Sequence, residues 1–117
     1  MPFGFTVDPT RHLAELRASD VVDLPGWLTA IAQARADPAF VAGMPVLVDE
    51  REVTSAPQAG EPRPVAEAWL THFSGSRIAY VSLPGRGIGG EIAILTQAEV
   101  RAYVHVDTAL EWLMGGP

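Results

Sequence analysis

The chain has 117 residues, of which 48% are hydrophobic, and a formal net charge of −6. That length predicts one domain, spanning residues 1–117, with a single modest core. It contains no cysteine, which excludes disulfides, thiolate metal ligands and cysteine nucleophiles. An acidic chain without lysine is also a poor candidate for nucleic-acid binding, because phosphate backbones require clustered basic side chains.

The chain carries no pattern typical of export or membrane insertion. Its N-terminus lacks the basic segment and long apolar run of a signal peptide. No apolar stretch approaches the roughly 20 residues that span a bilayer. We therefore expect a cytoplasmic protein that does not span a membrane.

The first elements predict a hairpin followed by a helix. Residues 3–8 alternate apolar with small or polar side chains, which is typical of a strand. After the Asp8-Pro9 turn signal, residues 12–18 are expected to form the second strand, although they also fit a helical turn. Asp23 then predicts a helix N-cap, and Asp37-Pro38 predicts the end of that helix.

The middle of the chain predicts a buried strand, a loop and a helix. Val46-Leu47-Val48 is a short continuous apolar run, which suits a strand buried on both faces of a sheet. The polar, proline-containing segment 50–64 is expected to be a loop. Pro64 suits the first turn of a helix over residues 64–73, and Gly75 suits its C-terminal cap.

The last third predicts two further strand–helix pairs. Residues 77–82 are expected to form a strand, 84–90 a glycine loop, and 91–100 a helix. A final strand over 103–106 precedes a helix capped by Asp107 and running through Leu113. The order β-β-α-β-α-β-α-β-α predicts the α/β class: a single mixed, mostly parallel sheet with an N-terminal antiparallel hairpin and helices packed on it.

This order, the opening Phe5–Pro9, the helix around Trp27 and the segment Pro45–Thr54 carry a family resemblance. The chain resembles the STAS domains, which have the anti-sigma-factor-antagonist fold. It is more similar to bacterial STAS-like proteins of unknown function grouped with the CRAL-TRIO superfamily. The resemblance implies a regulatory or binding module and a homodimer. We expect the module to need no cofactor.

The chain departs from the family at the position of its phosphorylation switch. STAS switches place Asp-Ser-Ser-Gly, or a close variant, at the start of the helix after such a strand. Here that position holds Pro57-Gln58-Ala59-Gly60, which keeps the glycine but has no hydroxyl to phosphorylate. Thr54 and Ser55 are nearby hydroxyls, but loop hydroxyls more often make turn hydrogen bonds. We therefore expect a module without the usual switch.

The segment Gly85–Gly90 satisfies the dinucleotide-binding pattern G-x-G-x-x-G and is followed by Asp107 at a suitable distance. Against this hypothesis, the pattern normally opens a longer nucleotide-binding half-domain, and Leu83-Pro84 interrupts the approach from the strand. A lid or an anion site at a helix start, contacted by Arg86, is the alternative.

No side-chain pattern predicts a catalytic or metal site. His12, His72 and His105 lack metal-ligand spacing, and the serines lack a nucleophile-elbow context. The acidic residues Glu50, Glu52 and Glu61 are interpreted as solvated loop carboxylates. The three tryptophans, on three predicted helices, are expected to pack in the core, with enough aromatic surface nearby for an apolar pocket or a dimer interface.

These observations favour a non-enzymatic module that binds a small apolar or amphipathic ligand, or a regulatory protein, around loops 54–64 and 83–90. Two alternatives remain: an antagonist-type regulator that binds a kinase-like partner, and a nucleotide-dependent enzyme that uses Gly85–Gly90. The candidate contact residues are Thr54, Ser55, Gln58, Gly60, Trp69, Arg86 and Gly87.

Overall fold

The computed structural model describes residues 2–55, 62–85 and 87–116. Its elements, in chain order, are β1 (Phe3–Asp8), β2 (Leu13–Val21), α1 (Leu24–Ala36), β3 (Val46–Ser55), α2 (Pro62–His72), β4 (Ile78–Val81), α3 (Gly89–Leu95), β5 (Val100–Tyr103) and α4 (Val106–Leu113). The predicted order of elements and the predicted α/β class are confirmed.

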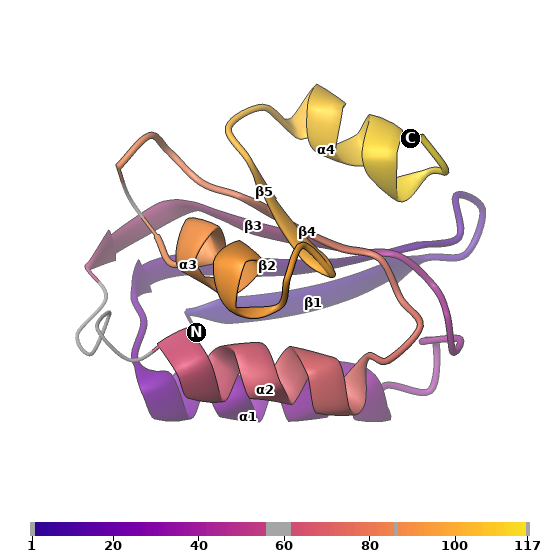
Figure 1. Cartoon of the computed structure of the whole chain (residues 1–117). Coiled ribbons are helices and arrows are strands. Elements are labelled where there is room, and N and C mark those ends of the chain that lie inside the picture. Colours follow the sequence, from indigo (N-terminus) through magenta and orange to yellow (C-terminus); the bar gives the residue numbers. More distant parts are fainter. Residues whose placement is uncertain (1, 56–61, 86, 117) are drawn as a thin grey trace.

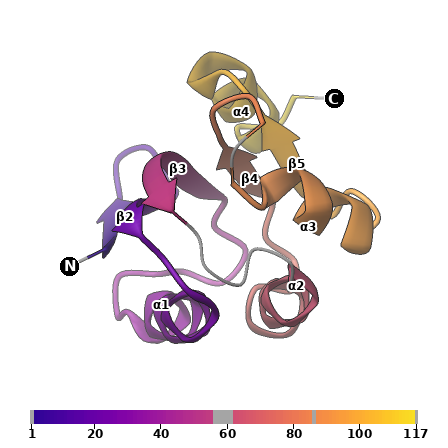
Figure 2. The same ribbon diagram turned by 90° about the vertical axis from the view of Figure 1, so that its left-hand side faces the viewer.

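The strands form one five-stranded sheet in the order β1-β2-β3-β4-β5. β1 and β2 pair antiparallel, with Phe5 opposite Leu16, and the remaining pairs are parallel. Helices α1 and α2 lie under one face of the sheet with α3 beside them, and α4 lies over the other face (Figures 1 and 2). Because successive parallel strands are added on the same side, the strand order never reverses.

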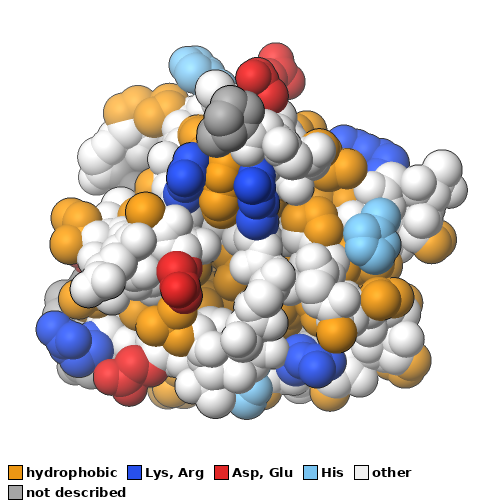
Figure 3. Space-filling view, turned by 45° about the vertical axis from the view of Figure 1, so that its right-hand side comes forward, with side chains coloured by type: hydrophobic (Ala, Val, Ile, Leu, Met, Phe, Trp, Pro, Cys, Tyr) orange, Lys and Arg blue, Asp and Glu red, His pale blue; other side chains and the backbone are white. Residues whose placement is uncertain are grey.

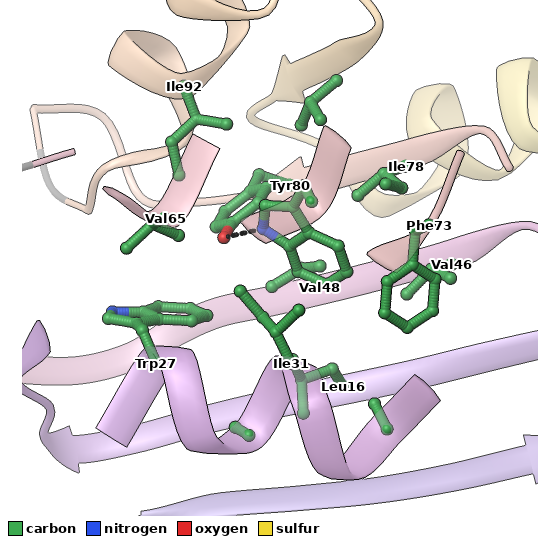
Figure 4. Packing of buried hydrophobic residues seen from close by; sticks show 14 of the residues in the cluster. Leu16, Trp27, Ile31, Val46, Val48, Val65, Phe73, Ile78, Tyr80 and Ile92 are labelled. Atoms are coloured by element: carbon green, nitrogen blue, oxygen red, sulfur yellow. Dashed lines mark hydrogen bonds between the residues drawn. The ribbon is translucent and has the colours of Figure 1, made fainter. Parts of the chain in front are cut away.

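The larger core lies between the sheet and helices α1, α2 and α3. Trp27 packs edge-on against Phe3 and lies 5.6 Å, centroid to centroid, from Tyr80. The Trp69 indole N–H donates to the Tyr80 hydroxyl at 2.7 Å, the bond dashed at Tyr80 in Figure 4. Both side chains are fully buried. The tryptophans of α1 and α2 are therefore core residues, as the sequence predicts.

Replacing Tyr80 with Phe is expected to lower the free energy of unfolding by about 1–3 kcal/mol, because the buried indole N–H of Trp69 loses its acceptor. Urea denaturation measures the change. Tyr103→Phe is the control, since the Tyr103 ring is only half-buried and its hydroxyl makes no hydrogen bond to a described residue. Equal losses in the two variants would show that the Trp69–Tyr80 bond contributes little.

A smaller core lies on the other face, beneath α4. Ala109, Trp112 and Leu113 of this helix pack on Leu47 and Val81 of the sheet. Farther along β2 and β3, toward their carboxyl ends, this face carries polar pairs instead.

Two ion pairs belong to that polar part of the face. Arg51 binds Asp49 through two hydrogen bonds, of 2.9 and 2.7 Å, and Arg17 lies 3.4 Å from Glu15. The Arg51 guanidinium lowers the pKa of Asp49.

The predicted loop over residues 50–64 is wrong in its first part, because β3 continues to Ser55. The extension pairs with β2 and places Ser19 opposite Glu52 and Val21 opposite Ser55, past irregularities in register. β4 ends at Val81, opposite Asp49, so beyond Asp49 the extension no longer pairs with β4. A polar sequence suits a strand with this smaller share of neighbours. Pairing with a distant strand, rather than local apolar pattern, makes this segment extended.

The boundaries near the C-terminus also differ from the prediction. The helix predicted over 91–100 is α3, which ends at Leu95, and Gln97 and Ala98 then form a turn with positive φ angles. The last strand consequently lies three residues earlier than predicted. His105 is therefore the N-cap residue of α4 rather than a strand residue, and Asp107 lies inside the first turn rather than at the cap.

Candidate functional site

The carboxyl ends of β3 and β4 meet at one edge of the sheet, where the chain places its most unusual buried side chain. Glu50 follows directly on the part of β3 that pairs with β4, and Ser82 follows directly on β4. The loop from Ser82 to Ile88 then leads into α3. In Figure 1 this loop and the tip of β3 lie together at the left of the molecule.

The Glu50 carboxylate is enclosed by this loop. Its side chain is only 3% exposed. One carboxylate oxygen, Oε1, accepts hydrogen bonds from the Ser82 hydroxyl, from the amide of Ile88 at 3.0 Å and from the amide of Gly89 at 3.2 Å. Glu50 therefore ties the start of α3 to the ends of β3 and β4.

The interpretation of Glu50 as a solvated loop carboxylate is wrong. The strand period explains the error, because Glu50 continues the alternation of Val46 and Val48 and so points to the same, buried face. Desolvation raises the pKa of Glu50 above its ordinary value, and the bonds from Ser82 and the two amides oppose that rise. The alternation of Val46, Val48 and Glu50 can be read from the sequence. It indicates that Glu50 is buried only if β3 is known to continue past Asp49.

Two glycines allow the loop to close on this carboxylate. Gly87 has a φ of +78°, and a Cβ at this position would overlap the Glu50 carboxylate. A Cβ on Gly89 would lie 2.6 Å from the Cβ of Tyr80. The glycine pattern thus has a packing reason in this fold, since it brings backbone close to a buried acid and to a buried ring.

The hydrogen bonds from Ile88 and Gly89 to Glu50 argue against the dinucleotide-binding hypothesis. A bound pyrophosphate needs free backbone amides at the start of the helix. Here the amides of Ile88 and Gly89 already bind an internal carboxyl group, that of Glu50. The sheet further lacks the reversal of strand order at which such folds bind nucleotides.

Comparisons with known proteins support the fold alone. No protein-family model and no curated protein matches the chain. Among solved structures, the chain is similar to an uncharacterized protein of the DUF3478 family from Shewanella loihica PV-4, which has a SpoIIAA-like fold. The two share 13% sequence identity with a TM-score of 0.59, over 95% of this chain and 91% of that one. The chain has a SpoIIAA-like fold. The predicted STAS-like architecture is thereby confirmed.

In this SpoIIAA-like domain, three of the predicted contact residues lie at the carboxyl edge of the sheet. Thr54 is exposed at the end of β3, and Gly87 lies against Glu50. Ser55 ends β3. Trp69 lies elsewhere, buried in α2 with its indole N–H bound to Tyr80. The remaining candidates, Gln58, Gly60 and Arg86, lie outside the described residues, as does the whole position of the switch motif.

Exposed apolar side chains complete this edge. Val21, at the end of β2, is 57% exposed, and Leu83, just after β4, is 42% exposed. We call Val21, Thr54 and Leu83 the carboxyl-edge surface.

Within residues 2–55, 62–85 and 87–116, no three His, Asp or Glu side chains gather in a way that would hold a metal ion. No helix in the same ranges is long and apolar enough to cross a bilayer.

Proposed function

We propose that this SpoIIAA-like domain is a non-enzymatic binding module that presents its carboxyl-edge surface to a regulatory protein partner. The contact between Glu50 and the loop supports this proposal best. An internal carboxylate uses the amides with which the loop would otherwise hold a phosphate, so the end of the loop at Ile88 and Gly89 is held without an external ligand. A loop fixed in this way is suited to presenting side chains to a partner.

The chemistry of the surface fits such a partner. Val21 and Leu83 offer isolated apolar contacts, and Thr54 offers a hydroxyl. Burial of exposed apolar side chains at the centre of a contact is the main source of affinity in protein complexes. A second copy of the chain, as expected from the family resemblance, and a kinase-like protein are both partners of this kind.

We expect the double variant Val21→Asp/Leu83→Asp to abolish partner binding while leaving the fold intact, because each change places a charge on an apolar contact. Affinity capture with quantitative mass spectrometry compares it with wild type and with Val41→Asp. The control residue is 54% exposed but precedes β3, at the opposite edge of the sheet.

Native mass spectrometry of the same three proteins shows whether the partner is a second copy. Loss of a captured protein, or of the dimer, in Val21→Asp/Leu83→Asp alone supports the proposal. Equal loss in Val41→Asp, or equal retention in all three, contradicts it.

A further inference from the structure

A groove at the amino edge of the sheet, opposite the carboxyl-edge surface, has the features of a second binding site. It has a volume of about 320 Å³ and lies between the end of α2, the turn before β5 and α4. Figure 3 shows it as a hollow with an apolar floor, directly below two basic side chains. The lining residues include Leu70, Phe73, Arg77, Ile78, Val100 and Trp112.

The floor of the groove is apolar and rigid. Phe73, Ile78 and Val100 are each at most 3% exposed, so their positions are fixed by the core. Leu70, at 39% exposed, is an apolar side chain on the wall that still faces solvent. A groove of this kind favours an apolar ligand segment, because burying it removes apolar surface from water.

Two guanidinium groups lie over the indole ring of Trp112, which lines this groove. The Arg77 Cζ lies 5.1 Å and the Arg101 Cζ 4.6 Å from the centroid of Trp112. One nitrogen of Arg77 also donates to the backbone oxygens of Trp112 and Gly116, which holds the side chain in place. Arg77 itself lines the groove.

The charge on these two arginines is not neutralised by the described part of the chain. The ion pairs found within residues 2–55, 62–85 and 87–116 are Arg17–Glu15 and Arg51–Asp49. The chain has 14 acidic residues against 8 basic ones, yet none of the described carboxylates pairs with Arg77 or Arg101. Two such unpaired positive charges near the groove attract an anion toward it.

We propose that this groove binds a small amphipathic carboxylate, with its apolar tail on the Phe73–Ile78–Val100 floor and its carboxylate toward Arg77 and Arg101. At the roughly 30 Å³ that one water-sized group occupies in a liquid, the groove holds about ten non-hydrogen atoms. That is the size of octanoate. Because this site lies at the other edge of the sheet, the proposal is independent of the partner-binding function.

Titration with octanoate, followed by NMR of the tryptophan indole N–H signals, tests the proposal. We expect saturable shifts of Trp69 and Trp112, which line the groove, and none of Trp27, which does not. Octanol has the same tail without the charge and is expected to bind more weakly, by about two- to fivefold, the difference that one partly exposed ion pair makes.

Two charge variants test the head-group contact without disturbing the fold. Arg77 is left unchanged, because it also binds two backbone oxygens. Arg101→Gln is expected to weaken octanoate binding by about two- to fivefold, and Glu99→Gln, which removes a negative charge from the groove wall, to strengthen it by a similar factor. Octanol binding should change in neither. The absence of saturable Trp112 shifts, or equal affinity for octanoate and octanol in all three proteins, would overturn the proposal.

Discussion

Glu50→Ala is expected to lower the free energy of unfolding by about 2–4 kcal/mol, because it leaves the Ser82 hydroxyl and two amides without their acceptor inside the protein. Urea denaturation measures the loss. The matched control is Glu52→Ala, two residues along the same strand but exposed, for which we expect a change within about 0.5 kcal/mol. Similar small changes in both variants would mean that the Glu50 contacts are not made in solution.

The pH dependence of stability distinguishes the effect of the titratable carboxyl group of Glu50 from the effect of its side-chain packing. The pKa of Glu50 is raised on folding, so its protonation favours the folded state. Its stabilising contribution is therefore fully present below the ordinary pKa of a glutamate and is lost as the pH rises through the raised value. Glu50→Gln does not titrate. Relative to this variant, the wild type should lose stability as the pH rises above 4.5, the ordinary pKa of a glutamate, and a difference that stays constant with pH would contradict the assignment.

Gly87→Ala is expected to lower the free energy of unfolding by about 2–4 kcal/mol, through the cost of a side chain at positive φ and through overlap with Glu50. Gly85→Ala is the matched control. Its φ is +72°, but nothing lies within 4 Å of the added Cβ. The substitution should therefore cost only the strain of a side chain at positive φ, about 1–2 kcal/mol.

A double-mutant cycle then isolates the contact between the two positions. In the Glu50→Ala background, Gly87→Ala should cost only about as much as Gly85→Ala does, because the carboxylate it would overlap is gone. Strictly additive losses would show that Gly87 and Glu50 do not touch. The same overlap predicts that any larger side chain at Gly87 disturbs the loop itself, so such variants cannot serve as neutral probes of ligand binding.

The candidate site was only partly predictable. The importance of the glycine segment was evident from its spacing, but its role was not, since the dinucleotide pattern and a close-packing loop require the same residues. Glu50 was missed because a charged residue after a short apolar strand is usually solvated. Arg77, Arg101 and Trp112 are far apart in the sequence, so no local pattern connects them to the groove.

The sequence by itself determined the α/β class, the order of elements and the start of α1 at its Asp23 cap, because these depend on periodicity and on residues close together in the chain. Only the tertiary structure decided that β3 runs on to Ser55, since this extension is stabilised by pairing with β2 rather than by its own polar residues. It also decided that Glu50 is buried. A carboxylate is buried only where distant donors converge on it, and here they come from the end of β4 and the start of α3.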